Sequence, residues 1–123
     1  MPHAQINAFV RMARDCVQKR FGSLDSPDYT AIIDATAFQR LVDALQEAQA
    51  QGATLVPLLD GPAWDVETRK IAPHIVLNVP PNCALQMREI FGPVLPVVGY
   101  TDLEDVVQII NTGPRPLAFY PFS

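Results

Sequence analysis

The chain has 123 residues, of which 49% are hydrophobic and 18% are charged, a balance typical of one soluble globular domain and unlike that of a disordered tail. Its formal charge of -4 at pH 7 argues against nucleic acid and anionic membranes as partners. No apolar run reaches the roughly 18 residues of a membrane span. Since there is also no signal-peptide core and only two cysteines, we expect a cytoplasmic protein.

Two segments in the first half have apolar residues at helical spacing. The first helix is predicted over 5–21, with Gly22 as a left-handed stop. Cys16 lies on its apolar stripe, so we expect a buried thiol rather than a nucleophile. The second helix is predicted over 36–51, with Asp34 or Thr36 as its cap.

The second half contains ten of the twelve prolines, which predicts short elements with stiff connections. Four short apolar runs read as strands. They are 53–59, 74–79, 94–99 and 117–120. Thr101 to Glu104 forms a capping-box pattern that predicts a helix ending near Asn111, with Leu103 and Val107 facing inward. The expected fold is α/β, a mainly parallel sheet with flanking helices.

Most catalytic signatures are missing from the sequence. It has no glycine-rich phosphate loop, no Cys-x-x-Cys and no His-Glu-x-x-His, and its two histidines are far apart. Cys83 falls in a predicted polar loop with no histidine nearby in sequence. The carboxylates around Asp102 are expected to stabilise a helix dipole. No metal site is predicted.

The segment 87–97 is the exception. Glu89 and Phe91 stand two residues apart on a turn that Gly92 and Pro93 would hold rigid. A carboxylate there could accept hydrogen bonds from two sugar hydroxyls, and the ring could cover a flat heterocycle. The alternative is a surface glutamate beside a core phenylalanine.

Glu-Ile-Phe-Gly-Pro-Val-Leu-Pro-Val at 89–97 resembles the signature segment of the aldehyde dehydrogenase superfamily. Other matching pieces follow in the order that the family requires. They are 27–29 with 32–33, the helix 38–45, 52–53, 75–77 and 111–118. The nearest branch is that of coniferyl aldehyde and class-three, fatty or aromatic, aldehyde dehydrogenases.

This resemblance implies roles for two residues. Glu89 would bind the nicotinamide ribose of NAD or NADP, and Phe91 would pack near the nicotinamide ring. In the family a cysteine attacks the aldehyde, hydride passes to NAD(P) and water releases the acid. In the family the nucleophile follows a Gly-Gln pair and precedes the helix that begins here near Gln5, so it would lie upstream of Met1, as would the general base and the cofactor domain. Cys16 does not match the nucleophile's position. Arg88 stands where many members carry a second acidic residue.

The leading hypothesis is therefore that 1–123 is one α/β piece of an aldehyde dehydrogenase catalytic domain, truncated at both ends. The parent enzyme would oxidise aromatic or long-chain aldehydes, and this piece alone would not catalyse the reaction. Its partners would be the rest of that enzyme and the aldehyde. The alternative is a non-catalytic remnant or structural module that self-associates through exposed strands, because the apolar run 117–122 has no predicted cover.

Overall fold

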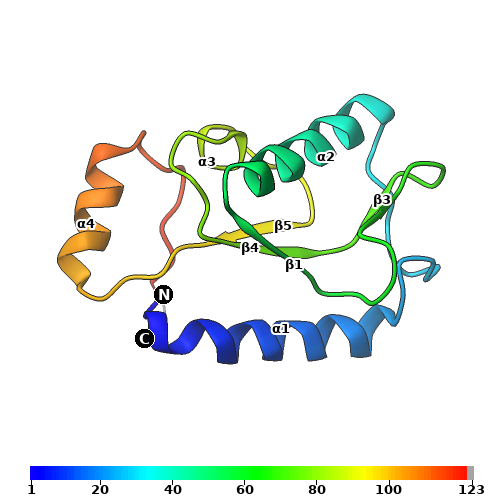
Figure 1. Cartoon of the computed structure of the whole chain (residues 1–123), viewed down its shortest axis with the longest axis horizontal. Coiled ribbons are helices and arrows are strands. Elements are labelled where there is room, and N and C mark those ends of the chain that lie inside the picture. The colour runs from blue at the N-terminus through cyan, green and yellow to red at the C-terminus, as the bar shows by residue number, and fades with distance from the viewer. Residues whose placement is uncertain (122–123) are drawn as a thin grey trace.

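Two long helices enclose a small sheet in the computed structural model of the protein, which describes residues 1–121. Helix α1 (Ile6–Phe21) lies along one face of the sheet and α2 (Ala35–Ala50) along the other (Figure 1). The remaining elements are short. They are η1 (His3–Gln5), β1 (Thr54–Pro57), β2 (Trp64–Asp65), β3 (Lys70–Ile71), β4 (His74–Leu77), α3 (Ala84–Met87), β5 (Val94–Val97) and α4 (Leu103–Thr112). The expected α/β class is confirmed.

The main sheet has the strand order β1-β4-β5 and is mixed. β4 and β5 run parallel, in register from His74↔Val94 to Leu77↔Val97, as expected. β1 instead runs antiparallel to β4. The difference lies in the connections: β4 reaches β5 through α3, whereas the hairpin β2–β3 returns the chain antiparallel to β1.

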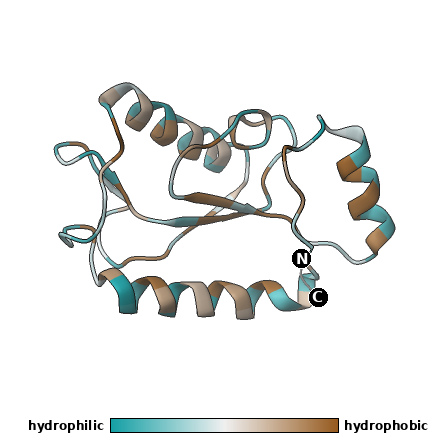
Figure 2. Cartoon of the chain, turned by 180° about the vertical axis from the view of Figure 1, so that it is seen from behind, coloured by the Kyte–Doolittle hydropathy of each residue, from teal (hydrophilic) through white to brown (hydrophobic). Residues whose placement is uncertain are grey.

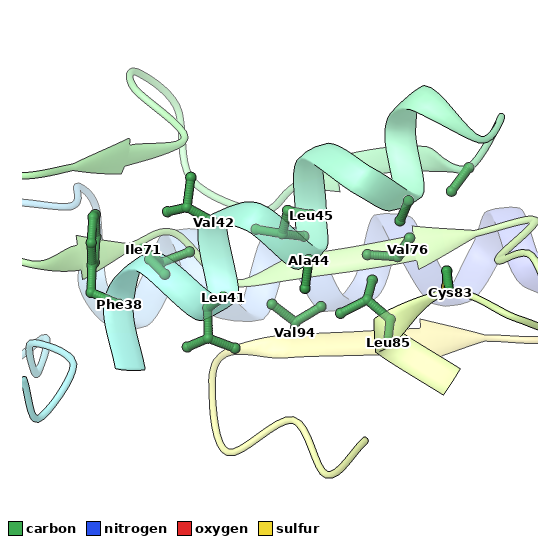
Figure 3. Close-up of a cluster of buried hydrophobic side chains, with 12 residues drawn as sticks. Phe38, Leu41, Val42, Ala44, Leu45, Ile71, Val76, Cys83, Leu85 and Val94 are labelled. Carbon is green, nitrogen blue, oxygen red and sulfur yellow. The ribbon is translucent and has the colours of Figure 1, made fainter. Parts of the chain in front are cut away.

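β4 is buried on both of its faces. Val76 belongs to the apolar cluster under α2, which also holds Leu41 and Val94 (Figure 3). Ile75 belongs to a second cluster, against which Val10 of α1 packs. Because neighbouring side chains of a strand point to opposite faces, a continuous apolar run here fills both layers. β4 is thus the centre of the fold.

The predicted first helix is confirmed as α1, and Gly22 ends it at φ 71°. However, the helix buries none of its residues completely. Val10, Ala13 and Val17 are half-buried along its inner stripe, whereas Cys16 is exposed. The expectation of a buried Cys16 was wrong, because this position lies at the margin of the stripe.

The other cysteine was also misplaced by sequence reasoning. Cys83 is fully buried in the α2 cluster, at the N-cap of α3. The short helix α3 was not predicted, because a single turn leaves no periodic pattern. Packing of α3 against α2 carries Cys83 into the core.

The end of the chain departs most from the expectation. The N-cap of α4 is Asp102, no side chain caps it, and the Thr101 box does not form. Leu103 and Val107, expected inward, are 66% and 56% exposed, and Figure 2 shows apolar residues along α4. Residues 117–121 form no strand, so the prediction of a strand at 117–120 was wrong. Phe122, the last residue of the apolar run, lies outside the described residues. Among residues 1–121, no helix is long and apolar enough to cross a membrane.

Candidate functional site

Glu89 and Phe91 lie in the irregular connection between α3 and β5. Both side chains are exposed, and Phe91 is 78% exposed. The alternative interpretation of Phe91 as a core residue is therefore wrong. The two side chains that the sequence singled out are both free to meet a ligand, as a binding role would require.

The backbone of this connection has an uncommon conformation. Phe91 has φ 46°, in the left-handed region that side chains with a Cβ seldom adopt. Such a conformation costs about 1–2 kcal/mol, so the surroundings must hold it. Two attachments adjoin it: Val94 N–H donates to the Gly92 carbonyl at 2.8 Å, and the connection is fastened to α2.

Arg40 of α2 makes that second attachment. Its Nη2 donates to the Ile90 carbonyl at 2.8 Å, and its Nη1 approaches the Glu89 carbonyl at 3.4 Å. The adjacent Leu41 is completely buried and faces Gly92, where an added Cβ would lie 2.6 Å from Leu41 Cδ1. Consecutive residues of one helix therefore fix the segment, Arg40 by hydrogen bonds and Leu41 by shape.

A groove opens between α2 and the α3–β5 connection, with a volume of about 950 Å³. Its walls carry charges of both signs, from Arg40, Asp43, Glu47, Arg88 and Glu89. Within the described part of the chain, Glu89 lines this groove and Phe91 does not. The groove thus offers hydrogen-bond donors and acceptors to a polar ligand.

The sequence reading did not identify Arg40 as part of the site. Arg40 sits between the apolar positions of α2, where a long cation is an ordinary solvent-facing residue. Its hydrogen bond to Ile90 joins residues 50 positions apart. No local pattern could have revealed that contact.

The titratable groups with shifted pKa values lie away from the groove. Burial lowers the pKa of His74. The hydrogen bond between its ring Nδ1 and the Ala72 carbonyl, at 2.6 Å, acts in the opposite direction but is the smaller cause. Burial also raises the pKa of Tyr29 to about 12, and its hydroxyl donates to the Ile71 carbonyl at 2.6 Å. Across residues 1–121, no group of His, Cys, Asp and Glu could hold a metal ion.

Comparison with known protein families identifies the family of this chain. The model of the aldehyde dehydrogenase family matches residues 4–122. The chain belongs to the aldehyde dehydrogenase family. That family uses NAD(P). The resemblance of 89–97 to the family's signature segment is therefore not a chance match.

Individual relatives agree with the family assignment. A probable coniferyl aldehyde dehydrogenase of Pseudomonas aeruginosa is 41% identical over the whole chain, which covers 25% of that protein. Aldehyde dehydrogenase family 3 member A2 of Rattus norvegicus is 37% identical over 93% of the chain and 22% of that protein. The chain thus spans about a quarter of the length of these curated relatives.

Solved structures support the fold. The substrate-bound state of Staphylococcus aureus AldH matches 94% of this chain and 24% of its own, with a TM-score of 0.80 and 27% identity. An NADP complex of succinic semialdehyde dehydrogenase from Streptococcus pyogenes covers 89% of this chain and 24% of its own, with a TM-score of 0.69 and 21% identity. This second likeness concerns the fold alone.

Proposed function

We propose that the chain is a segment of an NAD(P)-dependent aldehyde dehydrogenase that oxidises aromatic or long-chain aldehydes to carboxylic acids. The family membership supports the reaction class. The coniferyl aldehyde and family 3 relatives, at 41% and 37% identity, support the aldehyde class. Bound NAD(P) would accept hydride from the substrate, and the part of this chain is to bind and orient the cofactor.

Within that enzyme, we propose Glu89 and Phe91 as the nicotinamide-ribose wall. The observation that carries this role is the exposed Glu89 carboxylate at the margin of the groove. Two carboxylate oxygens can accept both ribose hydroxyls, and charge-assisted bonds of this kind are about twice as strong as neutral ones. The exposed Phe91 ring offers an apolar surface to a heterocycle.

Binding of nicotinamide riboside to the 123-residue chain tests this role, with titration followed by ¹H–¹⁵N NMR. Glu89→Gln should weaken riboside binding about tenfold, because a charged acceptor becomes a neutral one. Nicotinamide alone, which lacks the ribose, should bind both proteins equally. The matched control is Glu104→Gln on α4, which is exposed and lies outside the groove. Equal riboside affinity for wild type and Glu89→Gln would refute the assignment.

The chain itself is not expected to oxidise aldehydes. Of its two cysteines, Cys83 is buried and Cys16 lies in the middle of α1, so neither matches the family nucleophile. A nucleophile-dependent reaction loses most of its acceleration without that residue. Measurable NAD(P)-dependent oxidation of an aromatic aldehyde by the purified chain would contradict this expectation.

The two free thiols support a reducing, cytoplasmic location.

The exposed apolar surface around α4 is the observation behind a second candidate function, self-association. Leu117, Phe119 and Tyr120 are 100%, 67% and 76% exposed, and Leu103 and Val107 of α4 are 66% and 56% exposed. Apolar surface of this extent is usually buried against another protein surface. The rest of an aldehyde dehydrogenase is the partner we favour, and a second copy of the chain is the alternative. Light scattering of the purified chain decides between them: a monomer at high concentration excludes the second copy.

A further inference from the structure

The connection 88–92 has few hydrogen bonds of its own. Within the described residues, neither the N–H groups nor the carbonyls of Glu89, Ile90 and Phe91 take part in a backbone–backbone hydrogen bond of a turn or loop. The bonds on either side are Arg88 N–H to the Ala84 carbonyl and Val94 N–H to the Gly92 carbonyl. The segment therefore depends on side chains for its shape.

Arg40 supplies hydrogen bonds that the backbone of this segment does not make for itself. Its guanidinium donates to the Ile90 carbonyl at 2.8 Å and reaches the Glu89 carbonyl at 3.4 Å. Hydrogen bonds from a charged donor are stronger than neutral ones, and the planar fork of arginine can address two neighbouring oxygens. These contacts act directly before Phe91, the residue at φ 46°.

The position of Arg40 is itself fixed. Leu41 is completely buried and Phe38 is 3% exposed, so α2 is locked into the core on both sides of the arginine. Across residues 1–121, the salt bridge of the structure joins Arg14 to Asp60, and Arg40 forms none. The guanidinium is thus directed to the backbone, and the Glu89 carboxylate is left free for a ligand.

We infer that Arg40 is the positioning residue of this site: it holds the backbone of 89–91 in the conformation that presents Glu89 and Phe91. The inference rests on the proposed function, because the cofactor role of these two residues gives the positioning its purpose. Whether Arg40 fixes the backbone can nevertheless be measured without any cofactor. Arg40 also lines the groove, so its effect on the backbone is measured in the free chain, where no ligand contact contributes.

The first measurement concerns the free chain. In NMR spectra, the left-handed conformation of Phe91 gives a short distance between its amide and α protons and hence a strong cross-peak. Arg40→Met keeps the aliphatic stem and the helix propensity but removes both donors. This variant should weaken the cross-peak and shift the amide signals of 89–91, and Arg40→Lys, with one point charge, should give an intermediate result. The matched control is Arg11→Met, an exposed arginine of α1.

The second measurement is nicotinamide riboside binding to the same proteins. Arg40→Met should weaken binding about tenfold, as loss of a charged hydrogen bond typically does. Arg40→Lys should recover part of that loss, and Arg11→Met should bind as the wild type does. The amide dispersion of the rest of the spectrum reports whether each variant remains folded, so a folding defect is separated from a local one.

The two proposals fail in different ways. If Arg40→Met leaves the Phe91 cross-peak and the amide shifts of 89–91 unchanged in a folded chain, Arg40 does not position the segment, whatever binds there. If those signals change while Glu89→Gln leaves riboside binding unaltered, positioning by Arg40 stands and the cofactor role of Glu89 is refuted. A changed backbone with weakened riboside binding in both variants supports both proposals.

Discussion

Gly92 faces the completely buried side chain of Leu41, and a Cβ at this glycine would lie 2.6 Å from Leu41 Cδ1. A real Cβ does not approach a carbon so closely, and Leu41 has no free space in a close-packed core. The α3–β5 connection and α2 are therefore matched in shape at this point. The residue type at Gly92 follows from that contact rather than from its dihedral angles.

Replacement of this glycine tests the contact. Gly92→Ala should lower the free energy of unfolding by about 1–3 kcal/mol, as overpacking of a core typically does. Urea denaturation of the chain measures the change. The control is Gly113→Ala, where the nearest atom, the Ile109 carbonyl oxygen, is 3.4 Å from the added Cβ and φ is -86°. This control should change stability by less than about 0.5 kcal/mol; a similar loss in both variants would contradict the argument.

Two helix caps provide a second comparison. Asp34 accepts a hydrogen bond from the Ala37 N–H at 2.7 Å at the start of α2, whereas Asp102 makes no such bond at the start of α4. Asp34→Ala should destabilise the chain by about 1 kcal/mol, the usual cost of a lost N-cap. Asp102→Ala should lower the free energy of unfolding by less, as measured by the same thermal or urea denaturation. The reverse order would show that the cap bond of Asp34 is not formed.

The sequence could predict the elements whose signal is local. Apolar periodicity predicted α1 and α2, and β-branched runs predicted β1, β4 and β5, because these patterns recur within a few residues. The direction of β1 could not be predicted, since it depends on the two-residue strands β2 and β3. The exposure of α4 could not be predicted either. An amphipathic pattern predicts that the apolar face of a helix is covered, but it does not predict which surface covers that face.

The candidate site, too, could be predicted only where its signal in the sequence is local. Glu89 and Phe91 were found from the sequence because they are neighbours in one segment. Their exposure, the left-handed Phe91 and the contact of Arg40 across 50 positions depend on how α2 packs over the sheet. Residues that hold a segment from a distant helix leave no trace in its local sequence.

Tyr29 allows a test of a partly buried hydrogen bond. Its hydroxyl donates to the Ile71 carbonyl at 2.6 Å, and its ring meets Phe21 edge-on at a centroid distance of 5.0 Å. Tyr29→Phe keeps the ring contact but leaves the carbonyl without this donor. We expect a loss of about 1–2 kcal/mol in the free energy of unfolding. Urea denaturation at neutral pH measures it, and an unchanged midpoint would mean that water replaces the hydroxyl.

The buried His74 predicts how stability depends on acid. Burial is the main cause that holds the pKa of His74 below its ordinary value of 6.5, while its hydrogen bond to the Ala72 carbonyl acts in the opposite direction. Below pH 6.5 the unfolded chain therefore binds a proton at His74 that the folded chain does not bind. The free energy of unfolding should decrease as the pH falls from 6.5 towards the lower pKa of the folded state, by at most about 1.4 kcal/mol per pH unit.

Urea denaturation between pH 5 and pH 7.5 measures this dependence. His74→Gln retains a donor for the Ala72 carbonyl but cannot titrate, so its stability should vary less over this range. His3→Gln is the matched control, because His3 is exposed and lies outside the buried clusters. It should keep the acid dependence of the wild type. If His74→Gln loses stability in acid as steeply as the wild type, carboxylates rather than the buried imidazole set the acid sensitivity of this fold.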